Sequence, residues 1–111
     1  MSLIDKKEKI FVAGANGMVG SAIKLRLQKC GYRNLICPSR KELELKNSNL
    51  VFNWFEENKP NIVILAAAKV GGIYANNTYP AEFIYQNLMI QNNVIHNAFL
   101  NGVKKLLFLG S

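Results

Sequence analysis

The fold of this chain is decided by Gly14-Ala15-Asn16-Gly17-Met18-Val19-Gly20, a glycine-rich segment near its start. The segment follows the apolar run at residues 10–13, which is typical of a strand covered on both faces, and it opens a stretch with helical spacing. Glycines at this spacing permit a tight turn out of the strand, close approach of a diphosphate and close packing of helix on sheet. The unpaired N–H groups of a first helical turn favour an anion. A dinucleotide-binding strand–turn–helix unit is therefore predicted.

Strands and helices alternate along the rest of the sequence. Continuous apolar runs predict strands at residues 10–13, 35–37, 62–66 and 106–109. Helical spacing predicts helices at residues 18–29, at 48–58 after a cap at Asn47 or Ser48, and at 80–101. This alternation is typical of an α/β fold with a doubly wound parallel sheet, the Rossmann type.

The same spacing predicts which side chains are buried. On the first helix we expect an apolar stripe of Val19, Ile23 and Leu27. On the second helix we expect a buried stripe of Leu50, Val51, Trp54 and Phe55. The last strand, at 106–109, is uniformly apolar and is expected to be buried as a central strand.

The turn after the second strand bears on the choice of cofactor. An acidic residue there, about 20 residues past the glycines, would bind the ribose hydroxyls of NAD. This chain instead has Ser39-Arg40-Lys41. A guanidinium beside an ammonium suits a 2′-phosphate through charge-assisted hydrogen bonds, so NADP is predicted. The alternative is a solvated basic turn without a ligand.

Composition narrows the class of protein. The chain has 111 residues, of which 50% are hydrophobic, and a net charge of +7, which suits one globular domain. The cations are scattered, and no basic helix with interleaved aromatics appears, so no nucleic-acid partner is expected. The apolar run at 62–68 is too short to cross a membrane, and the start lacks a signal-peptide core. We expect a cytoplasmic protein in which Cys30 and Cys37 are either a structural pair or, preferably, two buried free thiols.

Four further stretches, with the glycine segment, resemble the GDP-L-fucose synthase family of extended short-chain dehydrogenase/reductases. The stretches are Leu65-Ala66-Ala67-Ala68-Lys69-Val70-Gly71-Gly72-Ile73, Asn76-Asn77-Thr78-Tyr79-Pro80-Ala81, Phe83-Ile84-Tyr85-Gln86-Asn87 and Lys105-Leu106-Leu107-Phe108-Leu109-Gly110-Ser111. The resemblance covers residues 9–111. It implies an NADP-dependent oxidoreductase and epimerase that converts GDP-4-keto-6-deoxy-D-mannose to GDP-L-fucose by 3,5-epimerisation and NADPH reduction.

The resemblance also implies roles for individual residues. Gly14, Gly17 and Gly20, within the segment 14–20, would hold the pyrophosphate, and Arg40 would hold the 2′-phosphate. Ala66, Ala67 and Ala68 would line the cofactor by backbone, with Lys69 and Asn87 near its ribose and nicotinamide end. Ser111 matches the catalytic serine, which donates a hydrogen bond to the C4 oxygen of the sugar. Lys69 could instead be a solvated charge, and Asn87 could tie the helix to a loop.

Two departures from the family bound these expectations. Asn16 stands where many members have a basic residue in the glycine loop. The catalytic Tyr-x-x-x-Lys pair lies beyond residue 111, and Cys30, Cys37 and His96 do not match the epimerising cysteine and histidine. We therefore expect a flexible tail at 1–8 and a partial NADP-binding Rossmann domain at 9–111, ending after a central strand without the substrate-binding region. This chain alone is expected to be inactive, and no metal site is expected, because His96 is the single histidine.

Three expectations concern partners and alternatives. The full-length protein is expected to be a homodimer that pairs the long helices at 80–101. Tyr79 and Tyr85 are expected to serve core or interface packing rather than catalysis, because Phe83 and Met89, not lysines, lie four residues after them. A related nucleotide-sugar 4-epimerase or 4,6-dehydratase is an alternative, although these usually carry an acidic residue at the position of Arg40. A non-enzymatic dinucleotide-sensing module is the other alternative.

Overall fold

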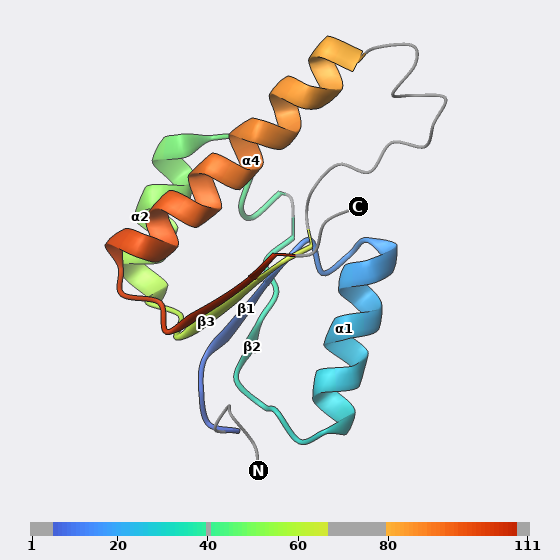
Figure 1. Cartoon of the computed structure of the whole chain (residues 1–111). Coiled ribbons are helices and arrows are strands. Elements are labelled where there is room, and N and C mark those ends of the chain that lie inside the picture. Colours follow the sequence, from blue (N-terminus) through green and yellow to red (C-terminus); the bar gives the residue numbers. More distant parts are fainter. Residues whose placement is uncertain (1–5, 40, 67–79, 109–111) are drawn as a thin grey trace.

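The described residues form a parallel four-stranded sheet with helices on both faces (Figure 1). The computed structural model describes residues 6–39, 41–66 and 80–108. The strands are β1 (Ile10–Ala13), β2 (Leu35–Ile36), β3 (Ile62–Leu65) and β4 (Lys105–Phe108). Helix α1 (Met18–Lys29) covers one face, while α2 (Ser48–Asn58) and α4 (Pro80–Leu100) cover the other. The predicted doubly wound α/β fold is confirmed.

The strand order reverses at β1 and β3, which are neighbours in the sheet. The order is β2-β1-β3-β4, and every neighbouring pair is parallel. The chain therefore moves outward from β1 to β2, crosses back to β3 and continues in the opposite direction to β4. In open α/β sheets a ligand binds where the order reverses in this way, at the carboxyl ends of the strands. Here those ends are level, because Ala13 pairs with Leu65 and the N–H of Ala66 donates to the carbonyl of Ala13 at 2.9 Å.

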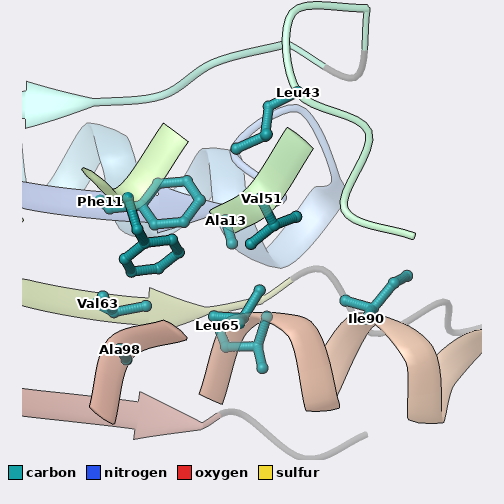
Figure 2. Packing of buried hydrophobic residues seen from close by; sticks show 10 residues of the cluster. Phe11, Ala13, Leu43, Val51, Val63, Leu65, Ile90 and Ala98 are labelled. Carbon is teal, nitrogen blue, oxygen red and sulfur yellow. The ribbon is translucent and has the colours of Figure 1, made fainter. Parts of the chain in front are cut away.

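The two central strands supply both halves of the core because their side chains alternate between the faces. Every residue of β1 and β3 is buried. On one face Ile10, Val12, Ile62 and Ile64 meet Ile23 and Leu27 of α1. On the other face Phe11, Ala13, Val63 and Leu65 join a cluster with side chains of α2 and α4. Figure 2 shows this second cluster, with Val51 of α2 and Ala98 of α4 gathered against the sheet residues.

An aromatic group anchors α2 on the sheet. The ring centroids of Phe11 and Trp54 lie 4.2 Å apart, and those of Phe11 and Phe55 lie 5.7 Å apart in an edge-on arrangement. Aromatic pairs of this kind contribute about 0.5–1.5 kcal/mol beyond the area that they bury. Val51 and Phe55 are fully buried and Trp54 is half-buried, so this part of the predicted stripe is confirmed.

The ends of the helices follow the local signals of the sequence. Asn47, one of the two predicted caps, accepts a hydrogen bond from the N–H of Leu50 at 3.1 Å through Oδ1 and so caps α2. Helix α1 ends at Lys29 with Cys30 as its C-cap, and Gly31 follows with the left-handed φ of 93° that glycine adopts without strain. None of the helices in the described ranges is both long and apolar enough to cross a membrane.

Three burial predictions, for Val19, Leu50 and Cys30, were wrong because of where each residue lies on its helix. Val19 and Leu50 are 53% and 45% exposed, because each lies in a first turn beside the line of contact, which runs through Gly20 and Ile23 in α1 and through Val51 and Phe55 in α2. Cys30 is exposed rather than buried, because it is the C-cap of α1.

The prediction that the last strand is buried was also wrong in the part of the chain that the structure describes. Leu106, Leu107 and Phe108 are 38–52% exposed. Strand β4 pairs with β3 along one side and is the edge of the sheet in the part of the chain that the structure describes. The described helices and strands therefore leave the apolar side chains of β4 partly uncovered.

The predicted tail at 1–8 stays a prediction, since residues 1–5 lie outside the described residues. Two residues of that range contact the sheet region. The carbonyl of Lys7 accepts a hydrogen bond from Nδ2 of Asn34 at 2.7 Å, and Glu8 pairs with Lys104 at 2.8 Å.

Replacing the cap of α2 tests how local signals stabilise this fold. We expect Asn47→Ala to lower the free energy of unfolding by about 1 kcal/mol, because the N–H of Leu50 loses its acceptor. The measurement is urea unfolding followed by circular dichroism. Asn47→Asp retains an acceptor and is the matched control, with stability close to that of the unchanged protein. An Asn47→Ala variant with an unchanged midpoint would contradict the assignment of this cap.

Candidate functional site

A cavity of about 270 Å³ opens at the carboxyl ends of β1 and β3, where the strand order reverses. Its wall is built from four parts of the chain. These are the glycine turn at 13–17 with Phe11, the segment 43–46 with Pro38, Ala66 after β3, and Gln86 and Ile90 of α4. Most of these side chains are apolar, while the turn also presents backbone groups. A crevice of this kind suits a ligand with a flat organic part and an anionic part.

Two of the three glycines in the turn are required by the fold itself. Gly14 has a φ of 87°, which other residues rarely adopt, and its carbonyl accepts a hydrogen bond from the N–H of Gly17 at 3.1 Å. A Cβ atom on Gly20 would lie 1.9 Å from the carbonyl oxygen of Gly14. Gly20 therefore permits α1 to pack directly on the turn that precedes it.

Gly17 has no such internal reason to be glycine. Its backbone is extended, with φ −78° and ψ 173°, a conformation open to any residue. A Cβ atom there would meet the carbonyl oxygen of Gly14 at 3.5 Å, an ordinary van der Waals contact. The residue is exposed and its atoms line the cavity. A ligand that approaches the backbone closely would explain a glycine that the protein does not need for its own packing.

The first turn of α1 is built to accept an anion. In the structure Gly17 is the N-cap, without a side-chain hydrogen bond to the helix, and the first turn holds no acidic residue. The N–H groups of that turn thus point out of the helix at its positive end. The side chains of Asn16, Met18 and Val19 are exposed, and Ala15 is buried. The segment therefore offers its backbone, rather than charged side chains, to a ligand.

A second turn borders the cavity after β2. The carbonyl of Ser39 accepts hydrogen bonds from the N–H groups of Glu42 and Leu43 at 3.0 and 2.9 Å. In return the carboxylate of Glu42 accepts a hydrogen bond from the N–H of Ser39 at 3.0 Å. This backbone hydrogen bond, with a further one from the Ser39 side chain, holds the pKa of Glu42 below its ordinary value. These hydrogen bonds tie Ser39 to Glu42 and Leu43.

Comparison with known proteins places this arrangement in a family. Residues 10–111 match the NAD dependent epimerase/dehydratase family. The chain belongs to that family. It is 60% identical over 110 residues to GDP-L-fucose synthase 1 of Arabidopsis thaliana, covering 99% of this chain and 34% of the relative. It is 55% identical over 105 residues to GDP-L-fucose synthase of Escherichia coli K12, covering 95% of this chain and 33% of the relative.

A solved structure of the family has the same fold. MlghC, a GDP-mannoheptose C4 reductase from Campylobacter jejuni solved with NADP bound, superposes with a TM-score of 0.91 at 50% identity. The match covers 96% of this chain and 34% of that chain. This chain spans about a third of the length of the curated relatives that it matches.

The structure brings together a part of the site that the sequence predicts for this family. Gly14, Ala15, Asn16, Gly17 and Ala66 all line the cavity. Met18, Val19 and Gly20 form the first turn of α1 beside it. Asn87 follows Gln86 in α4 and is half-buried. Gln86 lines the cavity, whereas Asn87 is not among the described residues of its wall. The cofactor role of Asn87 stays a prediction.

Other predicted site residues lie outside the described residues. They are Arg40, Ala67, Ala68, Lys69 and Ser111. Their predicted roles stay predictions, and so does the packing role of Tyr79. Tyr85 is 61% exposed on α4, so it is not a core residue in the part of the chain that the structure describes, and an interface role stays a prediction.

The sequence reasoning missed the segment Leu43-Glu44-Leu45-Lys46, all of which lines the cavity. These four residues alternate between apolar and charged side chains between Pro38 and the cap at Asn47. Such an alternation is the signal of a segment with one buried side, and it was available in the sequence. In the structure Leu43 is buried, while Glu44 and Lys46 form an ion pair at 3.5 Å.

The cysteines and the histidine take no part in this cavity. Cys30 and Cys37 are both free, so of the two predicted alternatives the structural pair is wrong. Partial burial raises the pKa of Cys37 above its ordinary value, although the charge of Lys24 acts in the opposite direction. Within the described ranges no group of three or more His, Cys, Asp or Glu side chains could hold a metal ion.

The two glycines at the start of α1 can be separated by experiment. We expect Gly20→Ala to cost about 3 kcal/mol or more of unfolding free energy, because its methyl group would strike backbone atoms that cannot move aside. Gly17→Ala should cost less than about 1 kcal/mol, since its methyl group has room. Chemical unfolding of the two variants side by side measures the difference. Equal destabilisation would contradict the distinction drawn between these glycines.

Proposed function

We propose that this chain forms the NADP-binding part of a GDP-L-fucose synthase, an oxidoreductase and epimerase that acts on GDP-4-keto-6-deoxy-D-mannose. The observation that carries the proposal is Gly17, a glycine that the fold does not require, on the wall of a cavity at the reversal of strand order. Identities of 60% and 55% to GDP-L-fucose synthases support the choice of reaction.

The cavity suggests how the cofactor lies. Its pyrophosphate would rest on the first turn of α1, against the backbone of Gly14, Gly17 and Gly20. The adenosine half would enter the apolar cavity between Pro38 and the segment 43–46. Arg40, which follows Ser39 in the sequence, would bind the 2′-phosphate and select NADP. MlghC, which has NADP bound, supports this choice.

The other predicted residues would act at the opposite end of the cofactor. Ala66, Ala67 and Ala68 would line it by backbone after β3, with Lys69 and Asn87 near the ribose and nicotinamide. Bound NADPH supplies the hydride that reduces the C4 ketone. Ser111 would donate a hydrogen bond to the C4 oxygen, where negative charge develops during reduction. The Tyr-x-x-x-Lys pair and the epimerising residues would come from the remaining two-thirds of a full-length protein.

A homodimer fits the outer face of α4. Tyr85, Leu88, Ile95 and Phe99 are 61%, 50%, 37% and 82% exposed, and their spacing places them on one side of the helix. An exposed apolar stripe of this kind is typical of a contact surface. We infer that two full-length subunits pair through this helix. We also infer a cytoplasmic location and no nucleic-acid partner.

A second candidate reaction is the C4 reduction of a GDP-heptose. The 50% identity to MlghC, a GDP-mannoheptose C4 reductase, favours it. Both candidates need NADPH and a GDP-bound 4-keto sugar, and they differ in the carbon chain of the sugar. The residues that would distinguish these sugars belong to the substrate-binding site, which is separate from the proposed cofactor cavity.

The cofactor assignment is tested by calorimetry on a full-length protein that contains this chain. We expect NADPH to bind more tightly than NADH, and Arg40→Ala to weaken NADPH binding by at least about tenfold with little effect on NADH. Gly17→Ala should weaken the binding of both NADPH and NADH, because its methyl group obstructs the pyrophosphate that the two cofactors share. Equal affinities for NADH and NADPH that Arg40→Ala leaves unchanged would refute the assignment.

Turnover by the same full-length protein decides between the two reactions. With NADPH, we expect GDP-4-keto-6-deoxy-D-mannose to yield GDP-L-fucose, detected by mass spectrometry and by loss of NADPH absorbance. The 111-residue chain alone should show no turnover. Preference for the 4-keto form of GDP-mannoheptose would favour the second candidate. Turnover by the short chain would contradict the proposal that the proton donor lies outside it.

A further inference from the structure

One face of α4 carries a row of side chains that runs away from the cavity. The row consists of Gln86, Ile90, Asn93 and Asn97, spaced three or four residues apart and so lying on one side of the helix, and Asn101 follows at the same spacing just after the helix ends. Gln86 and Ile90 line the cavity. Asn93, less than one turn further along, donates a hydrogen bond from Nδ2 to the carbonyl of Leu45 at 2.8 Å.

Leu45 belongs to the cavity segment 43–46, which has no regular secondary structure. The segment is tied locally, by the N–H of Leu43 to the carbonyl of Ser39 and by the N–H of Asn47 to the carbonyl of Glu44. These bonds link it to its immediate neighbours in sequence. The bond from Asn93 is different, because it spans 48 residues and joins the segment to another element of the fold.

We propose that Asn93 is a positioning residue for the dinucleotide. By holding the carbonyl of Leu45, it fixes the distance between the 43–46 wall and the wall formed by β1 and α4. The inference rests on the proposed cofactor function of this cavity. A wall held in place before binding spares the ligand the entropic cost of ordering a loop.

The chemistry of the side chain and the rigidity of its support both favour this role. An amide nitrogen donates to a carbonyl, whereas a carboxylate of the same size cannot donate and repels the carbonyl oxygen. Asn93 is half-buried, which shields the bond from water. Helix α4 is 21 residues long and anchored in the core by Ile90, Val94 and Ala98. Asn93 therefore holds the irregular segment 43–46 in a fixed position relative to α4.

Asn101, the residue that follows the end of α4, offers a matched control. Its Oδ1 accepts a hydrogen bond at 2.7 Å from Nζ of Lys59, the C-cap of α2. It is thus also an amide that ties α4 to the α2 region, but at the end away from the cavity. Loss of this bond should loosen the helix pair without moving the 43–46 wall.

The test measures cofactor affinity and kinetics of a full-length protein that contains this chain. We expect Asn93→Asp and Asn93→Ala to weaken binding of NADPH by about threefold to tenfold. Binding of the adenosine fragment 2′,5′-ADP should weaken by a similar factor, because the 43–46 wall would face the adenosine half of the cofactor. The KM for NADPH should rise while kcat at saturating NADPH stays unchanged. Asn101→Ala should leave both affinities and KM unchanged.

Two results would overturn the inference while leaving the proposed function intact. One is unchanged affinity in both Asn93 variants. The other is an equal loss of affinity in the Asn93 variants and in Asn101→Ala, which would mean general loosening of the helix pair. An unchanged protein that binds neither NADPH nor 2′,5′-ADP would overturn the proposed function and this inference with it. Asn93→Ala serves as the second variant if Asn93→Asp does not fold.

Discussion

The absence of a Cβ atom at Gly20 lets the first turn of α1 lie directly against the carbonyl of Gly14. Any larger residue would place a carbon 1.9 Å from that oxygen. This contact fixes where α1 begins and directs its unpaired N–H groups to the carboxyl end of β1. Because β1 borders the reversal of strand order, the same contact sets the positive end of the helix beside the cavity. The geometry of the site thus starts from one steric constraint.

Two of the three glycines are required by the fold, and the third is not. Gly14 provides a left-handed turn, and Gly20 permits close packing, so both would be glycine in a protein without a ligand. Gly17 adopts an ordinary backbone conformation with room for a side chain. A pattern of glycines in a sequence does not reveal this division. The structure separates the residue that points to a cofactor from those that shape the turn.

Much of the architecture could be predicted from the sequence because the signals are local. Continuous apolar runs mark β1 and β3, Asn47 marks the start of α2, and Gly31 marks the end of α1. Burial was less predictable, because it depends on what lies opposite a side chain. Val19 and Leu50 have the right spacing but sit beside the line of helix contact, and β4 is apolar yet lies at the edge of the described sheet. The tie from Asn93 to Leu45 spans 48 residues, and such a bond leaves no local signal.

The central claim is that the first turn of α1 binds the pyrophosphate of NADP. A crystal structure of a full-length protein containing this chain, grown with NADP, tests it most directly. The account predicts pyrophosphate oxygens about 2.7–3.2 Å from the backbone nitrogens of Met18 and Val19, in contact with the Cα of Gly17. A dinucleotide bound elsewhere, or one that meets this turn through its nicotinamide instead of its pyrophosphate, would contradict the account.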